Sequence, residues 1–169
     1  MTTDKEAKVA DLFRYGMQLQ MPAAYSKLEY YGRGPEENYI DRHASAFIGK
    51  YESNVKDEYY SYIRPQESGN HTDIRYFSIF NPTSGKGITF EAFGEMECSA
   101  IPYLVEDLDA GDEKNHSWGQ HSGDLVDKGL VQLHIQQRQY GLGCIDSWMT
   151  KPMEKYRMHY ADREFSFKI

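Results

Sequence analysis

The chain has 169 residues, of which 40% are hydrophobic and 14% are aromatic, and its formal net charge is −7 at pH 7. This length corresponds to about one domain and is enough to bury a core. The acidic balance and the lack of a lysine or arginine run argue against a nucleic-acid or anionic membrane surface as partner. No apolar run is long enough to span a membrane. The polar start, Met1 to Ala7, does not resemble a signal peptide, so we expect either a cytoplasmic chain or one excised from a longer precursor, and the choice between a cytoplasmic and a periplasmic location stays open.

Residues in the first third of the chain alternate between apolar and polar types. Residues 4–12 are expected to form a short helical turn or a disordered lead-in. Residues 13–21 alternate with a period of two, which predicts a half-buried strand, and residues 27–31 predict a second strand that runs into a glycine-rich loop. Residues 44–55 are ambiguous, because their apolar residues have helical spacing while Gly49 disfavours a helix.

Four further segments predict strands or strand pairs. Residues 72–80 and 88–93 predict a hairpin, because turn residues separate them. Residues 130–139 alternate strongly, and residues 157–169 are expected to form the final strand. The total is about seven strands with little helix, so the predicted fold class is an all-β antiparallel sandwich over a single domain, residues 1–169.

No metal site is expected from the sequence. The acidic segment of residues 106–120 lacks the ligand spacing of an EF-hand and predicts a solvated loop with at most a short helix. His116 and His121 lie five residues apart in a loop, which is too few ligands for zinc. Cys98 and Cys144 do not form a CxxC pair, so a disulfide is possible but unsupported.

The first motif is Tyr31-Gly-Arg-Gly-Pro-Glu-Glu-Asn-Tyr-Ile-Asp-Arg42. Its glycines and its proline specify a tight backbone path. Asp41 and Arg42 are adjacent and cannot easily face each other, so each is expected to pair elsewhere, as are Glu36 and Glu37. Neighbouring glutamates make a poor catalytic pair, because glycosidase carboxylates flank a bond from two sides. We therefore expect an architectural loop whose charges are paired.

Two more motifs follow along the chain. Residues 62–75 carry many polar side chains, which either fix the loop by hydrogen bonds or form a rim that contacts a sugar. Residues 140–148, Tyr-Gly-Leu-Gly-Cys-Ile-Asp-Ser-Trp, form a glycine-rich bend after a predicted strand. No helix is predicted to follow this bend, so it is a poor phosphate cradle. The bend instead delivers Asp146, Ser147 and Trp148 at a loop tip.

In this order, the three motifs resemble the GxGPxENYxDR, YxxPQExGNxTDxR and MGxGGDxSW signatures of the C-terminal β-sandwich domain of glycoside hydrolase family 2 β-galactosidases. The resemblance implies a galactose-mutarotase-like supersandwich, of which this chain would be the C-terminal half. It also implies that the catalytic glutamates belong to a barrel elsewhere in the parent enzyme, so no catalytic residue is expected here. The magnesium and sodium ions that the family uses would bind elsewhere, and no cofactor is expected on this chain.

The resemblance also implies roles for individual residues. Trp148 would form an aromatic platform under the sugar, with Asp146 and Ser147 as supports. Cys144 and Ile145 depart from the family pattern of glycine and acid. The remaining matched positions are expected to be structural; they are Gly32, Gly34, Pro35, Glu37, Asn38, Tyr39, Asp41, Arg42, Pro65, Gln66, Glu67, Gly69, Asn70, Asp73 and Arg75.

The expected partners are the catalytic barrel of the parent enzyme and a β-galactoside. The family places the second motif where the sandwich meets the rest of the enzyme. Half a sandwich would leave unpaired sheet edges, through which two copies could associate. Two alternatives stay open at this point: a free-standing carbohydrate-binding module and a non-catalytic interaction domain.

Overall fold

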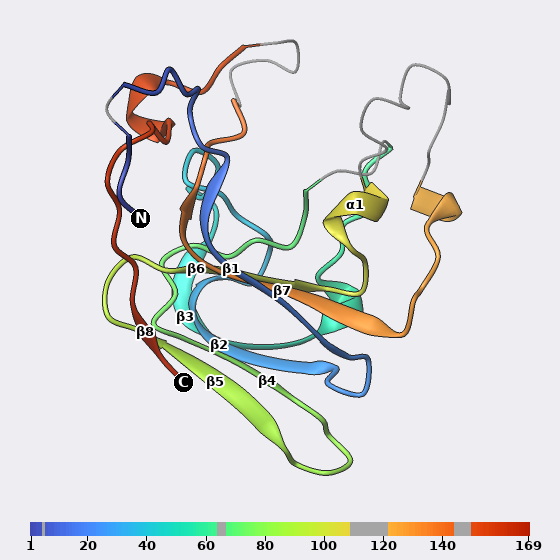
Figure 1. Cartoon of the computed structure of the whole chain (residues 1–169). Coiled ribbons are helices and arrows are strands. Elements are labelled where there is room, and N and C mark those ends of the chain that lie inside the picture. The colour runs from blue at the N-terminus through green and yellow to red at the C-terminus, as the bar shows by residue number, and fades with distance from the viewer. Residues whose placement is uncertain (5, 64–66, 109–121, 144–149) are drawn as a thin grey trace.

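The chain folds into two antiparallel sheets that pack face to face (Figure 1). The computed structural model describes residues 1–4, 6–63, 67–108, 122–143 and 150–169. The predicted all-β sandwich is confirmed, and neither sheet closes into a barrel.

The smaller sheet has three strands in the order β1-β7-β6. They are β1 (Arg14–Pro22), β7 (Leu130–Gln139) and β6 (Glu97–Ile101). The pairing of β1 with β7 joins the two segments with the strongest alternation, and a register shift lies between Tyr15 and Gly16. The predicted strands at 13–21 and 130–139 are therefore confirmed.

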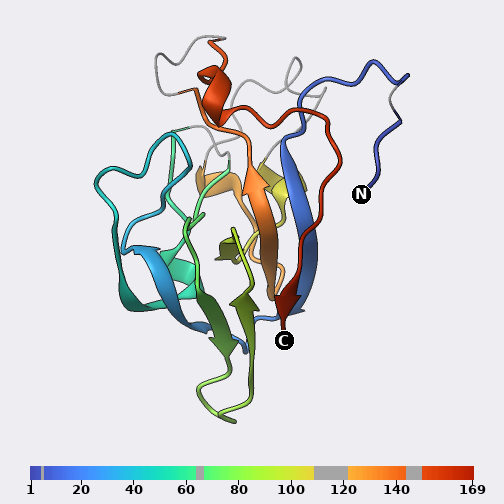
Figure 2. The same cartoon turned by 90° about the vertical axis from the view of Figure 1, so that its left-hand side faces the viewer.

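The larger sheet has five strands in the order β3-β2-β4-β5-β8, and Figure 2 shows it from the side. The strands are β2 (Lys27–Gly34), β3 (Phe47–Asn54), β4 (Tyr76–Phe80), β5 (Gly87–Ala92) and β8 (Phe167–Lys168). Most of the ambiguous segment 44–55 is thus a strand, because β3 pairs with β2 along its whole length, and a 3-10 turn η1 (Val55–Asp57) follows it. The predicted hairpin is β4 with β5.

The core lies between the inner faces of the two sheets. Its fully buried members include Leu28, Tyr30, Phe77, Ile79 and Phe90 from the larger sheet and Cys98, Val131, Leu133 and Ile135 from the smaller sheet. Burying one such side chain stabilises the fold by about 1.5–3 kcal/mol. The alternation that predicted the strands therefore also identifies the faces that meet.

Two predicted strands are shorter than expected. The strand expected over 72–80 begins only at Tyr76, because Asp73 adopts a left-handed φ of 55° that interrupts extended backbone. The strand expected over 157–169 is wrong for most of its length. Only Phe167 and Lys168 pair, with β5, and a 3-10 turn η4 (Glu154–Tyr156) precedes this segment.

The sequence prediction missed β6. Its residues alternate between polar and small apolar types, and all five are buried, so no exposed face marks the strand. The short helix α1 (Val105–Leu108) begins the acidic segment, and η3 (Ser122–Asp124) lies beyond it. Among the described residues of 4–12 there is no helix.

The outer strands of the two sheets are β1, β6, β3 and β8, and the outer edges of β1 and β3 have no pairing strand in the part of the chain that the structure describes. None of the described helices has the length and apolar character needed to cross a membrane.

Candidate functional site

Glu37 joins the first motif to the second. Its carboxylate accepts hydrogen bonds from the Arg42 guanidinium at 2.5 Å and from the Gly69 amide at 2.7 Å. The hydroxyls of Tyr39 and Tyr62 also donate to it. Gly69 has a φ of +77°, and a Cβ there would lie 2.8 Å from the Glu58 carbonyl oxygen, so only glycine brings its amide to this carboxylate. The nearly buried acid is thus fully paired.

Asn38 makes a second link between the two motifs. Its amide nitrogen donates to the carbonyl oxygens of Arg33 and Glu36, both at 3.0 Å. Its oxygen accepts from the Thr72 amide at 2.9 Å and from the Thr72 hydroxyl at 2.6 Å. Asn70 in turn donates to the Asn38 carbonyl oxygen at 2.9 Å. The first two motifs therefore form one hydrogen-bonded scaffold.

Asp41 brings the third motif to the same place. Its two carboxylate oxygens accept from the amides of Leu142 and Gly143, at 3.0 and 2.9 Å. These contacts join residues that are about a hundred positions apart in the sequence. All three motifs consequently meet at one end of the sandwich.

The other described motif residues lie around this scaffold. The Tyr30 hydroxyl donates to the Pro35 carbonyl oxygen at 3.2 Å, beside the end of β2 that holds Gly32 and Gly34. Asp73 pairs with Arg33 at 2.5 Å, and the Arg75 guanidinium donates to the Asp73 carbonyl oxygen at the same distance. A further pair joins Glu67 to Arg14 at 2.5 Å.

Five predicted residues lie outside the part of the chain that the structure describes. They are Pro65, Gln66, Asp146, Ser147 and Trp148. Their assigned roles stay predictions.

A buried acid–histidine pair, Glu58 with His71, lies beneath the scaffold. The Glu58 carboxylate is 2.6 Å from Nε2 of His71, and their side chains are 6% and 1% exposed. Nδ1 of His71 donates to the Arg33 carbonyl oxygen at 3.1 Å, and the Tyr30 ring packs on the imidazole with a centroid distance of 4.5 Å. No sequence pattern indicated this pairing, because Glu58 lies outside the three motifs.

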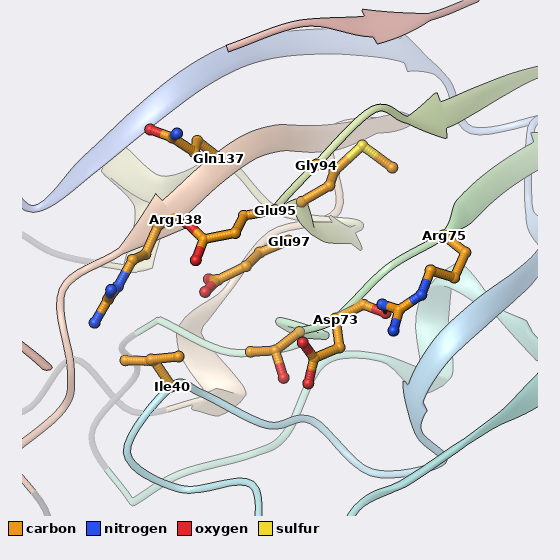
Figure 3. A pocket seen from close by; sticks show the side chains of 10 residues that line it. Ile40, Asp73, Arg75, Gly94, Glu95, Glu97, Gln137 and Arg138 are labelled. Carbon is orange, nitrogen blue, oxygen red and sulfur yellow. Dashed lines mark hydrogen bonds between the residues drawn. The ribbon is translucent and has the colours of Figure 1, made fainter. Parts of the chain in front are cut away.

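A cavity of about 300 Å³ opens beside the second motif (Figure 3). Figure 3 shows the side chains of Glu95 and Glu97 next to each other, with Asp73 across the cavity. The cavity is lined by Ile40, Thr72, Asp73, Arg75, Gly94, Glu95, Met96, Glu97, Gln137 and Arg138. Sequence reasoning missed Glu97, since β6 itself was missed.

Glu97 is 4% exposed, and burial raises its pKa to about 8. Hydrogen bonds from Asn70 and from the Gln139 amide, both at 3.3 Å, oppose this rise, while the charge of Glu95 adds to it. Glu95 precedes β6, and Figure 3 shows its side chain on the same side of the cavity as that of Glu97. These two side chains would approach a substrate from one side only, unlike the carboxylates of a glycosidase.

The described residues contain no group of three or more histidine, cysteine, aspartate or glutamate side chains that is placed to hold a metal ion.

A second cavity, of about 790 Å³, lies at the end where the motifs meet. Its wall includes Phe13 and Tyr140, whose rings pack edge to face with centroids 6.0 Å apart, together with Arg14, Glu67 and Lys151. Phe13 is 79% exposed. This end therefore presents aromatic and charged groups beside the base of the third motif.

The whole sequence, residues 1–169, matches the family described as beta galactosidase small chain. A β-galactosidase of Priestia megaterium is 36% identical over 151 residues, which are 89% of this chain and 14% of that protein. A β-galactosidase of Halalkalibacterium halodurans is 32% identical over 157 residues, 92% of this chain and 15% of that protein. A β-galactosidase of Streptococcus thermophilus is 27% identical over 168 residues, which are 98% of this chain and 16% of that protein. The chain thus spans 14–16% of the length of these relatives.

Proposed function

This chain belongs to the beta galactosidase small chain family, and we propose that it serves as an accessory segment of an enzyme that hydrolyses terminal β-galactosides. The relatives named β-galactosidase are about six to seven times longer than the region they share with this chain. The reacting carboxylates would lie in that additional length, in a catalytic barrel that this segment supports.

The observation that carries this proposal is the meeting of the three motifs at one end of the sandwich through Glu37, Asn38 and Asp41. A network of this kind holds loops in one shape, which suits a surface that must fit a partner. The catalytic barrel would contact this end. Trp148 would extend from the third motif to form an aromatic platform under the galactose, with Asp146 and Ser147 as supports.

The free edges of β1 and β3 offer a further contact surface. Unpaired strand edges readily add another strand. They would be covered by other parts of the parent enzyme or by a second copy of the chain. Sedimentation of the purified chain distinguishes the two arrangements, because only coverage by a second copy predicts a dimer.

The test is hydrolysis of a chromogenic β-galactoside by the complete enzyme that contains this chain. Trp148→Ala is expected to lower kcat/KM strongly, and Trp148→Phe to retain part of the activity, because an aromatic face remains for the sugar. Phe93→Ala, at an exposed ring outside the motifs, is the matched control and should behave like wild type. Unchanged kcat/KM in Trp148→Ala would contradict the platform role.

The chain alone separates this function from its alternatives. As an accessory segment it should neither cleave the β-galactoside nor bind galactose with more than weak affinity. Galactose binding that Trp148→Ala abolishes would instead indicate a free-standing carbohydrate-binding module. If the complete enzyme keeps full activity without this chain, a non-catalytic interaction domain is the better description.

A further inference from the structure

We propose that Asp41 is a positioning residue that fixes the base of the loop bearing Trp148. This inference rests on the proposed function, in which Trp148 contacts the sugar. It concerns the described residues on either side of the segment 144–149, and it links the first motif to the third.

The Asp41 carboxylate receives two consecutive backbone amides. Oδ1 accepts from Leu142 at 3.0 Å and Oδ2 accepts from Gly143 at 2.9 Å. Hydrogen bonds to an ionised carboxylate are stronger than neutral ones. An amide side chain in the same position would place its NH2 group, a donor, against one of the two backbone amides. An aspartate at position 41 therefore suits the two backbone amides, because each of its oxygens accepts one of them.

The chain around these amides is tightly packed. A Cβ at Gly141 would lie 2.6 Å from Oδ2 of Asp41, and a Cβ at Gly143 would lie 2.5 Å from the Thr150 carbonyl oxygen. Gly143 also has a left-handed φ of +78°. The backbone before the segment 144–149 thus lies against both Asp41 and the backbone that follows the segment.

Asp41 is itself held by its own turn. The amide of Tyr39 donates to the Arg42 carbonyl oxygen at 3.0 Å, and the amide of Arg42 donates back to Tyr39 at 2.8 Å. Tyr39 is completely buried, and Arg42 pairs with Glu37. Asp41 therefore lies on a rigid turn of the scaffold, and the loop base is fixed relative to the sandwich core.

A loop base that shifts would carry Trp148 with it. Displacing a substrate-contacting group by about 1 Å can reduce the rate by as much as 100-fold. We expect Asp41→Ala to lower kcat/KM by about 10- to 100-fold in the complete enzyme, with the same division between kcat and KM as Trp148→Ala. Asp41→Asn keeps the volume but places a donor against one of the amides, and it should also lose activity.

Gly141→Ala perturbs the same contact from the opposite side. Its new methyl group would displace the Asp41 carboxylate, so this variant should reproduce the loss seen in Asp41→Asn. Two controls match these changes. Asp57→Asn removes a carboxylate from η1, and Gly123→Ala, in η3, adds a methyl group where no atom lies within 4 Å. In double variants that combine Trp148→Ala with a change at Asp41 or Gly141, kcat/KM should be little lower than in Trp148→Ala alone.

A second readout does not depend on catalysis. With 5-fluorotryptophan incorporated in the chain, the fluorine resonance of Trp148, assigned through Trp148→Phe, should shift in Asp41→Asn and Gly141→Ala, while that of Trp118 stays unchanged. Both control variants should leave the two resonances unchanged.

The outcomes separate the two proposals. If Trp148→Ala leaves kcat/KM unchanged while the Trp148 resonance shifts in Asp41→Asn, the platform role fails and Asp41 still positions the loop. If Trp148→Ala impairs hydrolysis, but Asp41→Asn and Gly141→Ala alter neither kcat/KM beyond twofold nor the resonance, the assignment of Asp41 is overturned.

Discussion

The carboxylate of Glu58 lies 2.6 Å from Nε2 of His71 in an almost completely buried pair. The Nδ1 hydrogen of His71 is donated to the Arg33 carbonyl oxygen, which can only accept. The close Nε2–Oε2 contact therefore requires one proton between the two side chains. The pair joins the residue that follows η1 to the second motif.

Removing one partner of this pair should be costly. Glu58→Ala leaves Nε2 of the buried imidazole without its partner, and breaking a buried pair costs about 3–5 kcal/mol. We expect a loss of this size in the free energy of unfolding, measured with urea. Asp57→Ala, at the neighbouring carboxylate, should cost much less, because its hydrogen bond with Asn54 is exposed. Equal losses in both variants would show that the buried pair has no special role.

Asn38 should be the most sensitive uncharged residue of the scaffold. Asn38→Ala removes four hydrogen bonds and leaves the buried amide and hydroxyl of Thr72 without this acceptor, whereas the Arg33 carbonyl oxygen keeps its bond from His71. Each orphaned buried group costs about 1–3 kcal/mol, so a loss of about 2 kcal/mol or more in the free energy of unfolding is expected. Asn54→Ala serves as the control, because its side chain makes one exposed contact. Thermal unfolding followed by circular dichroism measures both.

Glu97 should make the fold less stable as the pH rises. Its pKa is about 8 in the folded chain against an ordinary 4.5. Between these values the folded state keeps a proton that the unfolded state has released, so stability falls by up to about 1.4 kcal/mol per pH unit. Glu97→Gln should remove this dependence, whereas Glu91→Gln, at an exposed carboxylate, should not. Urea midpoints at pH 5, 6.5 and 8 provide the comparison.

His134 should have the opposite effect at acidic pH. Burial, with a smaller contribution from the charge of Arg14, lowers its pKa from 6.5 to about 3. The Ser99 hydroxyl faces Nδ1 at 3.1 Å and Oε1 of the Gln18 side chain faces Nε2 at 3.3 Å, an arrangement that suits the neutral ring. Between pH 6.5 and 3 only the unfolded state takes up a proton, so stability falls as the pH decreases.

Replacing His134 with glutamine should flatten this acid limb, which urea midpoints measured below about pH 4.5 would reveal. His159→Gln is the control, because His159 is half exposed and pairs with Asp11 at the surface. In the wild-type chain the contributions of Glu97 and His134 oppose each other between pH 4.5 and 6.5, so this range should hold the stability maximum of these two groups. A fold that becomes steadily more stable up to pH 8 would contradict the behaviour assigned to Glu97.

By itself, the sequence determined the fold class and the longer strands. Residues 13–21 and 130–139 alternate because each strand has one face in the core, and this period is visible in one chain. The three motifs also indicated which residues would form the structural loops. Alternation along the chain did not predict two other features. Asp73 interrupts the strand expected over residues 72–80, and β6 was missed because both its polar and its apolar side chains are buried.

Only the tertiary structure decided which charged groups meet. Asp41 with Gly143, Glu58 with His71, and Asn70 with Glu97 join segments that the sequence keeps apart. The physical reason is that hydrogen bonding and desolvation depend on which strands pair, while hydrophobic periodicity depends only on neighbours along the chain. The same amino acids would carry other charges and other partners on a differently paired sheet.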